Sequence, residues 1–180
     1  MITREQQLRF RAYAATAIAK AGIALLPDEA NAIDVADFGL SDVEAEGALM
    51  LTMVDTEKVA AKVIVLLPNQ TLPEHWHVAL NDKPGKEETL RVTQGTLRLY
   101  VPGEDTLRVG FIPKGKQACY SSRHEILLQP GEQKTLPSGT KHWMQAGTDG
   151  AVVYSFSSYA YDALDPFTDP NVIRVTKVVD

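Results

Sequence analysis

The sequence predicts a mainly β protein, a sandwich or barrel of short strands preceded by helices. From about Gly47 onward, short segments rich in Val, Leu and Ile recur without a helical stripe. Turn residues separate these segments at regular intervals: Gly95, Pro102-Gly103, Pro130-Gly131 and 137–139. Many short strands with regular turns are typical of a sandwich or barrel. Before Gly47, apolar residues follow the helical period instead.

Residues 1–45 are expected to form a helical extension. Thr3 and Gln6 have the spacing of a capping box, and Gly22 marks the end of the first helix. Between them, apolar residues recur at helical spacing: Leu8, Ala12, Ala15, Ile18 and Ala19. Pro27 and the acids that follow it predict the first turn of a short second helix. We expect both helices to pack on the outside of the β domain, residues 46–180, or on a partner subunit.

The β domain is expected to begin with two strands, at residues 48–54 and 58–67. Shorter strands follow at five places: 90–92, 96–101, 125–128, 151–156 and 172–175. Residues 103–124 form a longer connection, which we expect to lie over the mouth of the barrel. His124 is interpreted as a residue of this loop.

Composition narrows the classes of partner. The chain has 180 residues, which suits one domain, and a formal net charge of −5. This charge argues against nucleic acid and membrane surfaces, because polyanions bind basic faces. No apolar run is long enough to span a bilayer, and the polar start does not resemble a secretory signal. Cys119 is the only cysteine, so no internal disulfide can form. We therefore expect a cytoplasmic protein.

The strongest chemical signal is His75-Trp76-His77. Residues i and i+2 of a strand point to the same face, so two imidazoles converge on one point. Imidazole suits Zn, Mn, Fe, Co and Ni, and a carboxylate completes such a site. Glu88 lies downstream, followed after six residues by Gly95, and His142 lies in a second stretch that begins at Gly131. These four residues are the expected metal ligands: His75, His77, Glu88 and His142.

The two stretches resemble the two sequence motifs of the cupin superfamily, whose fold is a double-stranded β-helix or jelly-roll barrel. The second stretch fits along its length, except that Ala146 replaces the final Asn of the pattern. The first departs twice, because Asn69 replaces the leading Gly and ten residues, instead of three or four, separate His77 from Glu88. The spacing to Gly95 selects Glu88 over Glu87. The inserted stretch contains residues 81–85, which predict a turn.

Longer segments resemble the short bacterial D-lyxose isomerases, which are cupins that prefer manganese. The segments are 73–77, 85–91, 140–147 and 167–170, and the similarity includes the ten-residue insertion. The resemblance implies an isomerase that converts D-lyxose to D-xylulose, and often D-mannose to D-fructose. It implies the same four metal ligands, Mn²⁺ with Zn²⁺, Fe²⁺ or Co²⁺ as other occupants, and a homodimer.

The expected chemistry moves a proton between C1 and C2 of an open-chain sugar through a cis-enediolate, whose negative charge a divalent cation stabilises. Lys86 is the candidate cation, because it lies two residues before Glu88 and relatives place a catalytic lysine there. Arg91 matches a family arginine and is a further candidate catalytic residue, although alternation turns it away from Glu88, which would suit a structural role. Ser155 stands where relatives carry a proposed acid/base Glu. Glu74, neutral Lys86 or a metal-bound hydroxide is therefore considered as the base.

The residues are also compatible with two other functions. An Fe(II) cupin dioxygenase uses a similar set of three His and one Glu. A sensing module that binds a sugar or a metal without catalysis is the non-enzymatic alternative, although no basic DNA-binding segment accompanies the barrel. The replacement of the family Glu by Ser155 keeps this last alternative open.

Overall fold

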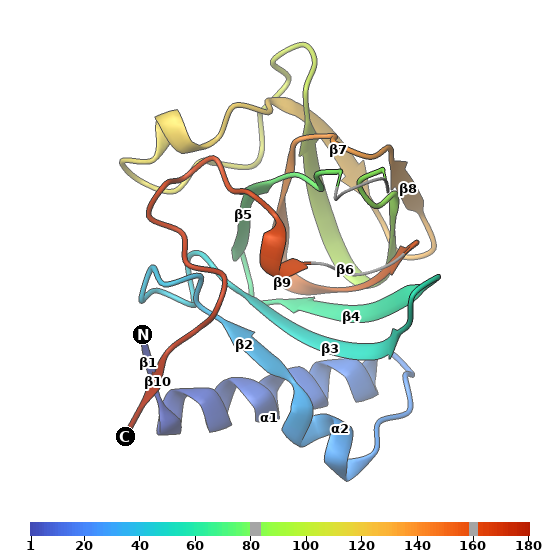
Figure 1. Cartoon of the computed structure of the whole chain (residues 1–180), viewed down its shortest axis with the longest axis vertical. Coiled ribbons are helices and arrows are strands. Elements are labelled where there is room, and N and C mark those ends of the chain that lie inside the picture. Colours follow the sequence, from blue (N-terminus) through green and yellow to red (C-terminus); the bar gives the residue numbers. More distant parts are fainter. Residues whose placement is uncertain (80–83, 159–161) are drawn as a thin grey trace.

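The computed structural model describes residues 1–79, 84–158 and 162–180, and it shows one strongly curved antiparallel sheet (Figure 1). The order along the sheet is β2-β3-β4-β9-β6-β7, while β5 pairs with β9 and β8 pairs with β6. The bounds of these strands are β2 Asp34–Ala36, β3 Ala48–Asp55, β4 Ala60–Leu66, β5 Thr71–His75, β6 Glu88–Val101, β7 His124–Leu128, β8 Gln133–Leu136 and β9 His142–Ser157. The expected barrel with external helices is confirmed.

The sheet curves because β6 and β9 are long and each contributes to both halves of the barrel. β6 pairs with β8 and the end of β9 in its first half, and with β7 and the start of β9 in its second. The register shifts next to Gly95, whose φ is +75°. A Cβ at Gly95 would lie 2.1 Å from the carbonyl oxygen of Gly150, so only glycine fits this crossing. The two strands expected at 90–92 and 96–101 are therefore one bulged strand.

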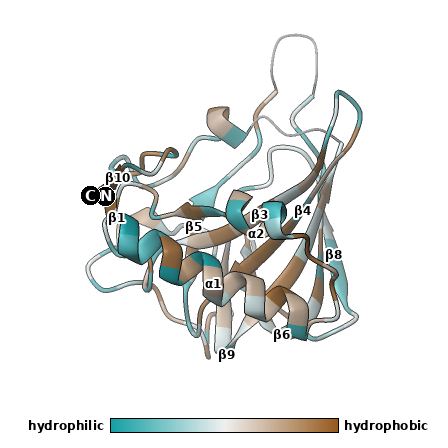
Figure 2. Cartoon of the chain, turned by 90° about the horizontal axis from the view of Figure 1, so that it is seen from below, coloured by the Kyte–Doolittle hydropathy of each residue, from teal (hydrophilic) through white to brown (hydrophobic). Residues whose placement is uncertain are grey.

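Helices α1 (Arg4–Lys20) and α2 (Pro27–Ala32) cover the outer face of the sheet (Figure 2). The expected capping box is confirmed, because the Gln6 amide donates to the Thr3 hydroxyl and the Thr3 amide donates to the Gln6 side chain. One face of α1 is buried on the strands through Phe10, Ala14 and Ile18. None of the helices in the described ranges is long and apolar enough to cross a membrane.

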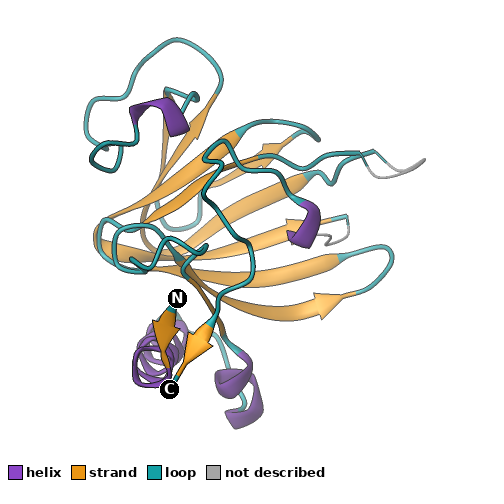
Figure 3. Cartoon of the chain, turned by 60° about the vertical axis from the view of Figure 1, so that its left-hand side comes forward, coloured by secondary structure: helices purple, strands orange, loops and turns teal. Residues whose placement is uncertain are grey.

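The two ends of the described chain meet beside α1 (Figure 3). Strand β1 (Ile2–Thr3) pairs in parallel with β10 (Val178–Val179). The strand expected at 172–175 is wrong, because those residues lie in an irregular segment and the last strand is β10. The loop assignment of His124 is also wrong, because His124 opens β7 opposite Val101. Apolar alternation in a short segment does not show which residues will pair with another strand. Both errors arose because strand pairing depends on distant residues.

Alternation along β4 separates two apolar layers. Ile64 and Leu66 point into the barrel, where they join the core formed with β6 and β9. Val63 and Val65 point outward and are buried under α1. A third cluster, formed by Trp143, Tyr100 and Tyr120, lies under the long connection that contains the short helix η1 (Gln117–Cys119). The barrel interior at the β5 end is polar, and it holds the candidate metal ligands.

Candidate metal centre

Four buried side chains meet inside the barrel. His75 ends β5, His77 follows it, Glu88 begins β6 and His142 begins β9 opposite His75. Their exposed fractions are between 0% and 7%. One donor atom from each residue lies within 4.8 Å of the donor atoms of the other three. Strand pairing has therefore brought together the three imidazoles and the carboxylate expected from the sequence.

Backbone carbonyls orient two of the imidazoles. Nδ1 of His75 lies 2.8 Å from the carbonyl oxygen of Pro73, and Nδ1 of His142 lies 2.9 Å from that of Thr140. A carbonyl oxygen only accepts, so each Nδ1 carries the proton and each Nε2 offers a lone pair to the centre. Nδ1 of His77 lies 3.0 Å from a carboxylate oxygen of Asp165, which is close enough for an ion pair but outside hydrogen-bond alignment.

The donor set fits a divalent metal ion. Nε2 of His142 is buried without a hydrogen-bond partner, and its nearest carboxylate oxygen, on Glu88, is 3.4 Å away. The same Glu88 oxygen lies 3.1 Å from Nε2 of His77. A buried polar atom without a partner costs stability, and a cation at the centre would give this lone pair its partner. Three neutral imidazoles and one carboxylate suit several first-row metals, so the donor set does not select one.

Burial and charge set the protonation of the ligands. Burial, together with His142 and His77, holds the pKa of His75 well below its usual value. Burial alone would raise the pKa of Glu88, but His142, His77 and the charge of Lys86 outweigh it and hold that pKa well below the usual range. Burial would lower the pKa of His77, but the carboxylates of Asp165 and Glu88 raise it. His75 and Glu88 are thereby held in the neutral and ionised forms that bind a metal.

Charged groups surround the space next to the cluster. The Ser155 hydroxyl donates to Glu88 at 2.5 Å. Lys86 is 6% exposed, and its ammonium donates to Asp162 at 2.7 Å. Asp162 begins the short helix η2 (Asp162–Leu164), which Figure 1 shows within the curve of the sheet. Lys62, on β4, contacts the same carboxylate, and Arg174 lies 4.0 Å from it.

Glu74 and Arg91 lie outside the cluster. The Glu74 carboxylate accepts hydrogen bonds from the backbone and hydroxyl of Ser121, the backbone of Ser122 and the hydroxyl of Thr168. Burial would raise the pKa of Glu74, but these donors outweigh it and lower that pKa. Arg91 is exposed and donates to Gln133 on the outer face. Glu74 directly precedes the inward His75, so alternation turns it to the other side of the strand.

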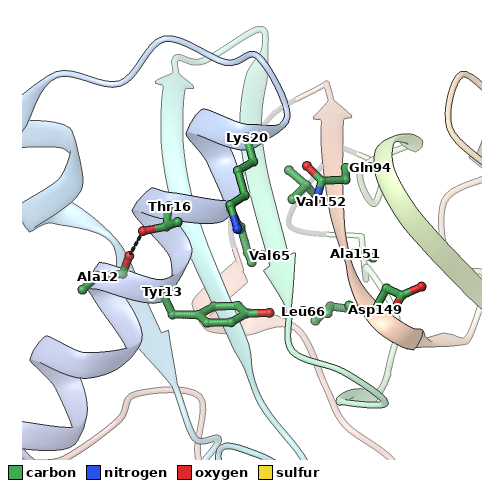
Figure 4. Close-up of a pocket in the computed structure, with 12 residues that line it drawn as sticks. Ala12, Tyr13, Thr16, Lys20, Val65, Leu66, Gln94, Asp149, Ala151 and Val152 are labelled. Atoms are coloured by element: carbon green, nitrogen blue, oxygen red, sulfur yellow. Dashed lines mark hydrogen bonds between the residues drawn. The ribbon is translucent and has the colours of Figure 1, made fainter.

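The candidate site is identified by its side chains and not by the volume of its cavity. The cavity beside the cluster is small, about 40 Å³, and is lined by Lys62, Lys86, Phe38 and Phe167 among others. A larger cavity of about 420 Å³ lies between α1 and the sheet (Figure 4). There Tyr13 and Lys20 of the helix line the cavity together with Gln94 of β6 and Asp149 of β9. Among the described residues that line the larger cavity, none belongs to the cluster of candidate metal donors.

Four charged residues of the site were missed by the sequence interpretation: Lys62, Asp162, Asp165 and Arg174. Lys62 had a signal, because it is a lone charge inside an apolar strand and shares its face with Ile64 and Leu66. The two aspartates had none, because they lie in an irregular segment whose position depends on distant contacts. The turn expected at 81–85 falls partly on residues 80–83, outside the described residues.

Comparison with known proteins gives consistent matches over nearly the whole chain. The family model described as D-lyxose isomerase matches residues 9–180. The D-lyxose/D-mannose isomerase of Thermosediminibacter oceani is 48% identical over 165 residues, which is 91% of each chain. The D-lyxose ketol-isomerase of Cohnella laeviribosi is also 48% identical, over 87% of this chain and 86% of that one. A D-lyxose ketol-isomerase of Thermofilum sp. is 42% identical over 99% of this chain and its own whole length.

Solved structures share the fold at low identity. L-ribose isomerase of Acinetobacter sp. DL28, in a variant complexed with L-ribose, gives a TM-score of 0.82 at 14% identity, covering 99% of this chain and 98% of that one. The ligand-free L-ribose isomerase of Cellulomonas parahominis gives 0.81 at 15% identity with the same coverage. At this identity the likeness shows a shared architecture, while the more similar relatives bear on activity.

Proposed function

The chain belongs to the D-lyxose isomerase family, and on this premise we propose that it is a metal-dependent ketol-isomerase that interconverts D-lyxose and D-xylulose. D-mannose and D-fructose form the second proposed pair, since the Thermosediminibacter relative carries both sugars in its name. The observation that carries the proposal is the buried cluster of His75, His77, Glu88 and His142 in a chain 48% identical to such enzymes. Neither the dioxygenase nor the sensor alternative has support among these relatives.

Isomerisation develops negative charge on two adjacent sugar oxygens, and the site supplies positive charge for them. A divalent cation held by the four ligands would act as a Lewis acid on O1 and O2. Lys86 lines the cavity beside the ligands, and we assign to its ammonium the stabilisation of the same oxygens. Phe38 and Phe167, whose ring centres are 5.5 Å apart, form an apolar wall that keeps bulk water from the reacting carbons.

Glu74 is assigned a positioning role in place of proton transfer. Its side chain accepts from Thr168, and the Thr168 amide donates to the Glu74 carbonyl oxygen at 3.0 Å. These contacts tie the segment that carries Phe167 and Asp165 to β5, next to His75. Arg91, on the outer face, is assigned a structural role.

The proposal is tested by assaying a panel of pentoses and hexoses with Mn²⁺, using wild-type protein, a chelator control and Lys86→Ala. The wild type is expected to form D-xylulose from D-lyxose, with the activity lost on chelation. Lys86→Ala should retain stoichiometric metal but lose about 100-fold or more of kcat, because the charge that matches the developing oxyanion is gone. A wild type that isomerises no sugar in the panel would refute the proposed function. Unchanged turnover in the variant would remove Lys86 from it.

Three finer predictions come from the family resemblance: manganese as the preferred metal, a homodimer and a cytoplasmic location. Metal analysis after reconstitution with Mn, Fe, Co and Zn salts, each followed by the same assay, checks the first. Sedimentation equilibrium checks the second, and fractionation of the source cells checks the third.

A further inference from the structure

Lys62 is a residue of the site that the sequence motifs do not include. It lies on β4, on the inward face that also carries Ile64 and Leu66, and its side chain is 13% exposed. Its partner across the sheet is Ser155 of β9, whose hydroxyl donates to the ligand Glu88. Strand pairing therefore puts the Lys62 side chain into the cavity beside the metal cluster.

The surroundings of Lys62 make its ammonium easier to deprotonate than that of an ordinary lysine. Burial, followed by the charges of Lys86 and Arg174, lowers the pKa of Lys62 to about 8. Contact with Asp162 acts in the opposite direction, but that carboxylate is shared with Lys86 and Arg174. Loss of the Lys62 proton thus leaves Asp162 with two cationic partners. The charged groups that face the Lys62 ammonium are Asp162 and Arg174 of the C-terminal segment, Lys86, Glu88 of β6 and Asp55 of β3.

The other described groups near the cluster are poor bases for carbon acid chemistry. The Ser155 hydroxyl donates to Glu88, and serine is not basic at neutral pH. Asp162 is ion-paired with Lys62 and Lys86, which weakens it as a base. Asp165 faces Nδ1 of His77, where it orients a ligand.

We propose that Lys62 is a catalytic residue of the isomerase, the base that carries the proton between C2 and C1. This inference rests on the proposed function. The neutral amine takes the proton from C2, the C2–H electron pair forms the C1–C2 double bond, and the carbonyl electrons move to O1. The resulting ammonium returns a proton to C1, while the hydroxyl proton of O2 passes to O1 and C2 becomes the carbonyl carbon. No electrons or atoms leave the substrate, so no co-reactant is needed.

In this proposal, Lys62 and Lys86 have different roles in catalysis. Lys86 supplies fixed positive charge to the oxygens, and Lys62 supplies a proton acceptor to the carbons. Two like groups whose surroundings differ are a common way to obtain a charge stabiliser and a base from one residue type. The same division predicts that kcat rises with pH through the titration of Lys62 and then levels off, since only the neutral amine accepts the proton.

Two substitutions separate the base from a mere positive charge. Lys62→Met keeps the unbranched stem of the side chain without the amine, and Lys62→Arg keeps the charge but does not deprotonate in the working range. Both are expected to lose about 100-fold or more of kcat, with metal content unchanged and KM within about threefold. Lys58→Met, at an exposed lysine in the β3–β4 turn, is the matched control and should stay within about twofold of wild type.

A direct measurement accompanies the kinetics. NMR titration of ¹³C-lysine side chains in the metal-free protein should show one lysine near pH 8 that is absent in Lys62→Arg. Wild-type turnover in Lys62→Arg would mean that only the charge matters and would overturn the proposal, as would Lys62→Met within about threefold of wild type or no lysine titrating below about pH 9. If the wild type isomerises, such results refute only the role of Lys62. A wild type without isomerase activity refutes the proposed function and this role with it.

Discussion

Replacing His142 by Leu should abolish the stabilisation that a metal ion gives to this protein, while hardly changing the stability of the metal-free form. Nε2 of His142 is fully buried and has no hydrogen-bond partner among the described residues. If this atom is a metal ligand, its removal costs little until a metal is added. If His142 were an ordinary core residue, its removal would weaken the protein with or without metal.

The sizes of the two effects follow from the contacts. In the metal-free form, Leu gives up the hydrogen bond from Nδ1 to the Thr140 carbonyl, which costs about 1 kcal/mol, and removes an unpartnered buried nitrogen, which recovers about 1–3 kcal/mol. The net change should stay within about 1–2 kcal/mol. In the wild type, Mn²⁺ at about 1,000 times its dissociation constant should add about 4 kcal/mol to the free energy of unfolding. For a chain of this size, that corresponds to a rise in Tm of about 8–16 °C.

The assay is thermal unfolding with excess EDTA and with excess Mn²⁺. Wild type should show the large rise in Tm, and His142→Leu should show almost none. His124→Leu, a substitution outside the cluster, controls for the general effect of removing a histidine and should keep the rise. A full metal-induced rise in His142→Leu would refute the assignment of this ligand. So would a metal-free variant weakened by about 4 kcal/mol or more, because that loss is typical of a packed core position.

Two further substitutions probe the groups behind the ligands. Ser155→Ala removes the hydrogen-bond donor to Glu88 and should lower metal affinity about tenfold in a chelator competition. Ser158→Ala, at an exposed serine, is the control and should leave the affinity unchanged. Equal affinities in Ser155→Ala and wild type would exclude this role of Ser155. Glu74→Gln should destabilise the protein above the unfolded pKa of about 4.3, because the folded-state pKa of Glu74 is lowered and ionisation then favours folding. The difference from wild type in urea unfolding should shrink as pH falls through the folded-state pKa; a difference independent of pH would contradict this linkage.

Sequence periodicity was most informative where contacts are local. The capping box at Thr3 requires only a spacing of three residues, and it forms as expected. The convergence of His75 and His77 is expected from strand alternation, and their ring centres lie 5.2 Å apart, although β5 ends at His75 and His77 follows the strand. The same alternation correctly turned Arg91 outward, and it also places Glu74 on the face opposite His75.

Prediction was weaker where bulges and pairing intervene. Its position between two apolar runs predicts that Gly95 separates two strands, but Gly95 bends one continuous strand across Gly150. The residues at 172–175 alternate like a strand without finding a partner, whereas His124 finds Val101. A short segment of sequence carries no information about which distant segment will pair with it through backbone hydrogen bonds.

By itself, the sequence determined a mainly β chain with helices at its start, and it predicted four candidate metal ligands from strand geometry and a family motif. Only the tertiary structure decided which charged groups would join those ligands. Lys62 reaches them because β4 pairs with β9, and Asp162 meets Lys62 and Lys86 because the C-terminal segment packs back into the barrel. Local spacing sets the face on which a side chain lies, whereas long-range pairing sets its neighbours, and the chemistry of this site depends on both.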